Sequence, residues 1–127
     1  PIAEASAQQI VFYSNIDSDS YIEKIRYFKS GTLLVKGVVK PSGNPLVYNS
    51  SAEITTTVAN DLCNGANPLF YYYDESFTSS STPLIQPVAV TSVRVIKISL
   101  DIDEDPQTSP ALFHVESKVQ IRNLKTN

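Results

Sequence analysis

The stretch from Tyr21 to Lys40, which reads YIEKIRYFKSGTLLVKGVVK, decides the expected fold because it holds two strand-like halves around a tight turn. Both halves are rich in aromatic and β-branched residues, which favour strands. Ser30-Gly31 forms a two-residue turn in which glycine accepts a positive φ. Pairing across this turn sets Phe28 opposite Leu33. The stretch therefore predicts an antiparallel hairpin.

More strands are expected on both sides of this hairpin. In the last one, apolar side chains at Phe113, Val115 and Val119 alternate with polar ones, which predicts one buried face and one wet face. Within residues 92–103 the apolar parity switches, which predicts a bulge or a change of sheet. The expected additional strands are residues 10–14, 68–74, 92–103 and 111–124.

Two segments favour helix. Residues 1–9 are rich in Ala and Gln and are predicted to be the end of an N-terminal helix. Ser50 and Glu53 have the spacing of a capping box, and Ile54, Val58 and Leu62 follow as one apolar stripe. The second segment therefore predicts a short internal helix.

The expected fold class is α+β, with strands dominant. A helical stump and one short helix would pack on a mostly antiparallel sheet in a single domain, residues 1–127. The composition agrees, since the chain has 23 Val and Ile residues but only nine Leu and eight Ala.

The inventory of charged and reactive residues excludes several functions. A net charge of −3 gives no basic patch for nucleic acid, so no nucleic-acid partner is expected. One cysteine rules out an intrachain disulfide, and one histidine rules out a two-histidine metal site. Cys63 and His114 lie in no motif that pairs a thiol with a base, so no catalytic residue and no enzymatic activity are predicted.

Two acidic segments are candidates for Ca²⁺, the only cofactor considered. Asp17 and Asp19 alternate with other residues in a polar run, as ligands of a calcium loop do, although the Gly and Glu of the EF-hand pattern are missing. Asp101 and Asp103 share one face of a strand. A solvated turn and a solvated strand end are the competing interpretations of the two segments.

The order of several segments resembles a known family. Residues 119–125, Val-Gln-Ile-Arg-Asn-Leu-Lys, resemble the closing strand of bacterial type IV pilin-like proteins, above all the J-type minor pseudopilins and the minor pilins. Residues 10–14, Asp17 with Asp19, and residues 23–28 are similar to the part that follows the long helix of these proteins. The likeness extends through residues 34–38, 41–48, 53 and 70–74, in the family's order.

The resemblance implies a structural subunit of a type IV pilus or a type II secretion filament, with other pilins or pseudopilins as partners. An apolar helix before Pro1 would anchor it in the inner membrane before assembly, and the domain would then lie at the cell surface. Polar loops at strand ends are the expected contacts with neighbouring subunits. The candidates are Ser79, Ser80 and Asp105, in the loops 75–83 and 101–110, and the loop 41–49.

A second interpretation is a β-rich binding module of the cell surface, similar to an adhesin, for a sugar or protein ligand. Tyr71-Tyr72-Tyr73 and the Ser/Thr-rich loops suit it, although core packing also explains the tyrosines. A small hydrolase is disfavoured because the chain has few of the required residues.

Overall fold

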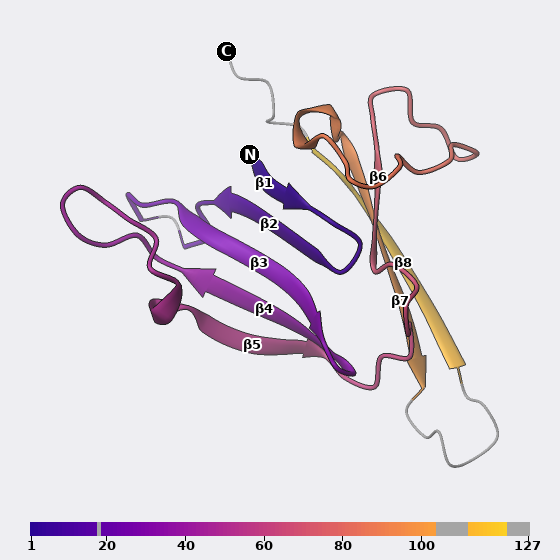
Figure 1. Ribbon diagram of the computed structural model, residues 1–127, viewed down its shortest axis with the longest axis horizontal. Helices are drawn as coiled ribbons and strands as arrows, with labels where there is room; N and C mark the ends of the chain where they lie inside the picture. The colour runs from indigo at the N-terminus through magenta and orange to yellow at the C-terminus, as the bar shows by residue number, and fades with distance from the viewer. Residues whose placement is uncertain (18, 104–111, 122–127) are drawn as a thin grey trace.

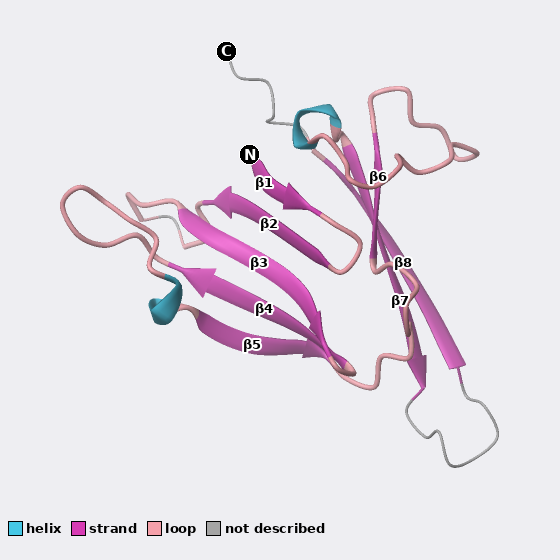
Figure 2. Ribbon diagram, in the orientation of Figure 1, coloured by secondary structure: helices cyan, strands magenta, loops and turns pink. Residues whose placement is uncertain are grey.

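The computed structural model describes residues 1–17, 19–103 and 112–121, and over these residues the chain is all-β. The strands form two antiparallel sheets, on the left and the right of Figure 1. The first sheet has the order β1 (Ile2–Ala5), β2 (Gln9–Ser14), β3 (Glu23–Ser30), β4 (Leu33–Val39), β5 (Ile54–Ala59). The second has the order β6 (Phe70–Tyr73), β7 (Val95–Asp103), β8 (Leu112–Gln120). The described helical turns are two short 3-10 helices, η1 (Ser50–Ala52) and η2 (Val90–Ser92), coloured cyan in Figure 2.

The predicted α+β class is wrong, first because residues 1–9 are not helical. They form β1, a turn closed by the bond from Ser6 N to Gln9 O, and the start of β2. Ala5 pairs with Ile10 and is buried in the core. The helix propensity of Ala and Gln is worth less than 1 kcal/mol per residue. Pairing with the edge of β2 outweighs it, because it satisfies backbone groups and buries one side of the strand.

The predicted internal helix at residues 50–62 is also wrong. Only η1 is helical, with Asn49 as its N-cap through the bond from Ser51 N to Asn49 Oδ1. The chain then continues as β5 along the edge of β4. The run from Ile54 to Val58 contains only β-branched residues, which lose side-chain freedom in a helix and suit a strand.

The predicted hairpin is confirmed as β3 and β4, with a changed register. Phe28 pairs with Val35 instead of Leu33, so the register is shifted by two residues and each side chain keeps its predicted face. Gly31 has φ +60° and is the first central residue of the turn, with Thr32 as the second. A turn with glycine in that position is one of the two that match the twist of paired strands.

A polar network crosses the outer face of the first sheet. The guanidinium of Arg26 on β3 donates from Nη2 and Nε to the Glu53 carboxylate at 2.7 and 3.0 Å, and from Nη1 to Gln9 Oε1 at 3.0 Å. Gln9 Nε2 in turn donates to Glu4 Oε2 at 2.9 Å. Gly37 on β4 leaves the space that the Glu53 carboxylate occupies. Side chains thus link strands that are not adjacent in the sheet.

Both sheets contribute to one core. Leu69, Phe70 and Tyr72 at β6 are almost fully buried, and they share a cluster with Ile10 and Leu34 of the first sheet. The Tyr72 hydroxyl donates to Ser6 O at 2.7 Å, which ties β6 to the turn between β1 and β2. Burial raises the pKa of the Tyr72 hydroxyl well above its ordinary value, and the negative charge of Glu4 adds to this rise.

The final strand is confirmed as β8, but its predicted buried face is wrong. Phe113 and Val115 are 54% and 46% exposed, and every described side chain from there to Gln120 is exposed. β8 is the edge strand of the second sheet, and none of its described side chains belongs to the buried core, so the face predicted to be covered stays open. The bulge or change of sheet predicted from the parity switch in residues 92–103 is wrong, because β7 pairs with β8 without a shift in register from Val95 to Asp103. Val93 is buried before β7 begins, and Val95 and Ile96 are buried on opposite faces of the strand.

Candidate docking groove and neighbouring sites

An apolar groove of about 640 Å³ lies between the two sheets and is the largest cavity described here. Its deep end belongs to the shared core, while its rim is open to solvent. The first sheet contributes Ile10, Phe12, Tyr27, Leu34 and Val58. The second contributes Phe70, Ile96, Ile98, Leu100 and Val119, with Ile121 just after β8.

The side chains that line the groove range from buried to half exposed. Ile10 and Leu34 are buried, whereas Val58 and Val119 at the rim are 52% and 47% exposed. Between them the rings of Phe12 and Tyr27 stack with centroids 6.2 Å apart. The centroid of the Tyr27 ring also lies 5.9 Å from Lys36 Nζ, within the range of a cation–π contact. The walls are therefore built from side chains that the sheets hold in place.

The chemistry of this groove is that of apolar contact. Apart from Tyr hydroxyls and Ser14, its lining consists of apolar side chains. Phe113 and Val115 extend the exposed apolar surface along β8 beyond the groove. Contiguous apolar surface of this kind marks a site of association with another polypeptide or an apolar ligand. The alternation in residues 111–124 is the sequence signal for it, although that pattern predicted a covered face.

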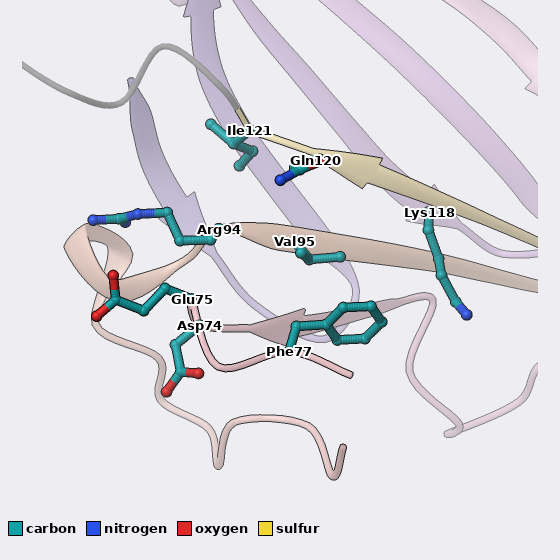
Figure 3. Close-up of a pocket in the computed structure, with 8 residues that line it drawn as sticks. All are labelled: Asp74, Glu75, Phe77, Arg94, Val95, Lys118, Gln120 and Ile121. Atoms are coloured by element: carbon teal, nitrogen blue, oxygen red, sulfur yellow. The ribbon is translucent and has the colours of Figure 1, made fainter. Parts of the chain in front are cut away.

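A second, polar cleft of about 460 Å³ lies near one end of the second sheet (Figure 3). Asp74 and Glu75 reach it from the segment after β6, whereas Arg94 directly precedes β7 and Lys118 comes from β8. Phe77 lies among them, and Lys118 Nζ is 5.6 Å from the centre of its ring. An aromatic ring flanked by charges of both signs suits a polar ligand better than an apolar one.

The predicted contact residues lie in different regions. Ser79 and Ser80 are exposed in the loop between β6 and η2. The backbone N–H of Ser80 donates to Thr78 Oγ1 at 3.4 Å, so this loop is partly ordered by its own hydroxyl groups. Asp105 lies outside the described residues.

Asp101 and Asp103 share one face of β7, as predicted, but Asp101 is engaged by a histidine. His114 Nδ1 lies 2.6 Å from Asp101 Oδ1, and His114 Nε2 lies 2.9 Å from Glu116 Oε2. The two carboxylates, Glu116 first, raise the pKa of His114 above its ordinary value. Within the described part of the chain, neither aspartate belongs to a group of three or more ligand atoms of cation-binding size.

Cys63 is exposed and lies beside the same strand, with its N–H donating to Asp101 O at 2.7 Å. Desolvation, together with the charges of Asp101 and Asp103, raises the pKa of its thiol. This direction is opposite to that of an activated nucleophile, which requires a stabilised thiolate.

Asp17 and Asp19 lie together in the connection between β2 and β3, as predicted for a cation site. Glu23, the first residue of β3, joins them, so that oxygens of all three carboxylates lie within 4.8 Å of one another. Lys40 Nζ contacts Asp17 Oδ2 at 2.6 Å and Asp19 Oδ2 at 3.6 Å. The sequence alone does not indicate Glu23 as a third ligand, because its segment is predicted to be a strand of the hairpin. Glu23 follows Asn15, Asp17 and Asp19 at an even spacing, and this continued alternation is the signal in the sequence.

Comparison with known proteins gives no relative: no family model, no curated protein sequence and no solved structure matches this chain. A search of the described residues for a helix long and apolar enough to span a bilayer found none. The interpretation of function therefore depends on the residues themselves.

Proposed function

We propose that this chain is a non-enzymatic structural subunit that acts by assembling with other subunits, as a minor pilin or pseudopilin of a type IV pilus or type II secretion filament. The apolar groove between the sheets carries the proposal, because its rim leaves Val58 and Val119 about half exposed. Covering such side chains stabilises an assembly by about 25 cal/mol per Å² of apolar surface.

The occupant we propose for the groove is the apolar helix that pilin-type subunits contribute to the core of the filament. A helix has a diameter of roughly 10–12 Å with its side chains, which is as wide as the spacing of roughly 10 Å between packed sheets, so the helix would lie along the open rim of the groove. Pro1 and Ile2 also line the groove. A helix that preceded Pro1, as the resemblance implies, would end at the groove.

The first test is the coding sequence upstream of the codon for Pro1. A basic leader, a cleavage site and about 20 apolar residues would support the proposal. A cleavable secretory signal or a second soluble domain in that place would contradict it.

The second test concerns the groove. In the full-length subunit, Val58→Asp and Val119→Asp place a charge at the rim, whereas Ile85→Asp is a matched control at an 89% exposed site outside the lining. The measurement is the fraction of subunit recovered in sheared filaments. We expect both rim variants to be lost from the filaments, whereas the Ile85→Asp control is incorporated like the wild type. The folded domain of each of the three variants should melt at the wild-type temperature. Normal incorporation of both rim variants would show that the groove has no part in assembly.

The polar cleft favours a second candidate function, the cell-surface binding module. Its arrangement of Phe77 between acidic and basic side chains resembles a sugar-binding platform, and β1 in place of a helical stump is compatible with such a module. A glycan array tests it with Phe77→Ala against Phe113→Ala, a control on an exposed aromatic of β8. Specific binding that only Phe77→Ala abolishes would favour the module, and an array without specific binding would remove it.

A further inference from the structure

The connection between β2 and β3 lies at the end of the first sheet that points away from the second sheet (Figure 1). Asp17 and Asp19 lie in this connection, and Glu23 lies where β3 begins. Lys40 follows β4 directly and reaches the same place. None of these residues lines the groove or the polar cleft, so this cluster has no part in the proposed function.

Each of the three carboxylates accepts a backbone hydrogen bond from the same connection with one oxygen, and one oxygen of each lies within 4.8 Å of the others. Asp17 Oδ1 accepts from Asp19 N at 3.3 Å, and Asp19 Oδ1 accepts from Tyr21 N at 2.8 Å. Glu23 Oε1 accepts from Ile16 N at 3.1 Å. The second oxygens of both aspartates face Lys40.

The observation that points to a ligand is the state of Glu23. This residue is fully buried, with a relative exposure of 0%, yet its Oε2 has no hydrogen-bond partner among the described residues. A buried carboxylate oxygen without a partner is costly, and native proteins pair or coordinate such groups. Lys40 does not supply the partner, since its ion pairs are with Asp17 and Asp19.

Charge and size both fit a divalent cation. The three carboxylates carry a local charge of −3, which a divalent cation in place of the Lys40 ammonium would reduce to −1. Oxygens on opposite sides of a Ca²⁺ ion, each about 2.4 Å from it, are about 4.8 Å apart. The carboxylate oxygens of this cluster fall within that span. Ca²⁺ also accepts the irregular, all-oxygen coordination that a loop offers, whereas Zn²⁺ prefers nitrogen and sulfur ligands.

We propose that Asp17, Asp19 and Glu23 form a Ca²⁺ site that closes the connection between β2 and β3. The buried Glu23 oxygen supplies a fixed ligand, and the two aspartates supply exposed ones. Lys40 holds the aspartates together without the ion and competes with it. Its ammonium swings away when Ca²⁺ binds, which its 62% exposed side chain permits.

The test is a Ca²⁺ titration of the chelator-treated protein by calorimetry. We expect one site in the wild type and a loss of affinity of roughly tenfold or more in Glu23→Gln, because one charged ligand is removed. Glu75→Gln removes the same charge from an exposed glutamate in the polar cleft of the second sheet and should leave the affinity unchanged. Lys40→Gln should change the affinity in the opposite direction and raise it, because the competing ammonium is gone.

Each outcome decides the proposal. No saturable binding by the wild type, or equal affinities for Glu23→Gln and Glu75→Gln, would overturn it. A lower Ca²⁺ affinity in Lys40→Gln would show that the ammonium does not compete with the ion, and it would overturn the proposed site between the three carboxylates. If Glu23→Gln does not fold, Lys40→Gln still tests the site, because its exposed side chain makes that variant safe for folding.

Discussion

Replacing Gly37 by alanine should destabilise the protein because it disturbs the contact between Arg26 and Glu53. A Cβ at Gly37 would lie 2.5 Å from Glu53 Cδ, so the Glu53 carboxylate would have to move. That carboxylate ends a flexible side chain and would move easily if Arg26 did not hold it through two hydrogen bonds at 2.7 and 3.0 Å. The penalty of Gly37→Ala is therefore the loss of the contact between Arg26 and Glu53.

The magnitude follows from that contact. Hydrogen bonds between charged groups contribute about 1.5–3 kcal/mol, and the low end applies because solvent screens a partly exposed pair. The Arg26 and Glu53 side chains are 32% and 17% exposed. Alanine is better than glycine within a strand by about 0.5 kcal/mol. We expect Gly37→Ala to lower the free energy of unfolding by about 1 kcal/mol, the difference between these two effects.

The sign should reverse in a second background. In Glu53→Ala the carboxylate is gone, so Gly37→Ala should stabilise by about 0.5 kcal/mol. Urea denaturation of the wild type, both single variants and the double variant measures the four free energies, provided that the m-value stays constant. An equal penalty for Gly37→Ala in both backgrounds would refute the reasoning, since the cost would then arise from the strand and not from Glu53.

The same contact should depend on pH. Arg26 lowers the pKa of Glu53 below its ordinary value of 4.5, because it donates hydrogen bonds to the ionised carboxylate. A lowered pKa in the folded state adds stability above the unfolded-state value and loses it as the pH falls through the folded value. The penalty of Gly37→Ala should therefore be full at neutral pH and shrink below about pH 4.5.

Three more outcomes are expected. Tyr72→Phe removes the bond to Ser6 O and leaves a part-buried carbonyl without this donor, and it should lower the free energy of unfolding by about 1–2 kcal/mol in urea denaturation. Leu69→Ala creates a cavity at a fully buried site and should cost about 2–5 kcal/mol in the same assay, whereas a cost below 1 kcal/mol would argue against the described core. His114 should titrate above its ordinary pKa in NMR, and Glu116→Gln should bring its pKa back down. Because that pKa is raised in the folded state, its stabilising effect is present at low pH and disappears as the pH rises through it, so an unshifted His114 would contradict the described contacts.

The local pattern of the sequence was sufficient where one short segment contains all the information. The hairpin of β3 and β4 follows from β-branched runs around Gly31, and its two-residue shift in register kept each side chain on its predicted face. The alternation in residues 111–124 likewise identified β8. In both cases the period of two is a property of the strand itself, so it is visible without knowledge of the neighbours.

The tertiary structure decided the segments whose local preference is weak. Two segments could form helices by composition or by spacing, namely residues 1–9 and the stretch from Ile54 to Ala59. Each lies beside a strand, β2 or β4, whose edge would otherwise have no partner strand. Pairing with that edge satisfies several backbone groups at once, and no count of propensities includes this gain.

The candidate sites divide in the same way. The sequence identified Asp17 and Asp19 because their alternation is local, and it identified the apolar residues of β8 for the same reason. It missed Glu23 as their neighbour and predicted a covered face where an open groove lies, because burial depends on which sheet edges remain free. Periodicity and composition are properties of one segment, whereas burial and the meeting of distant charges are properties of how segments pack.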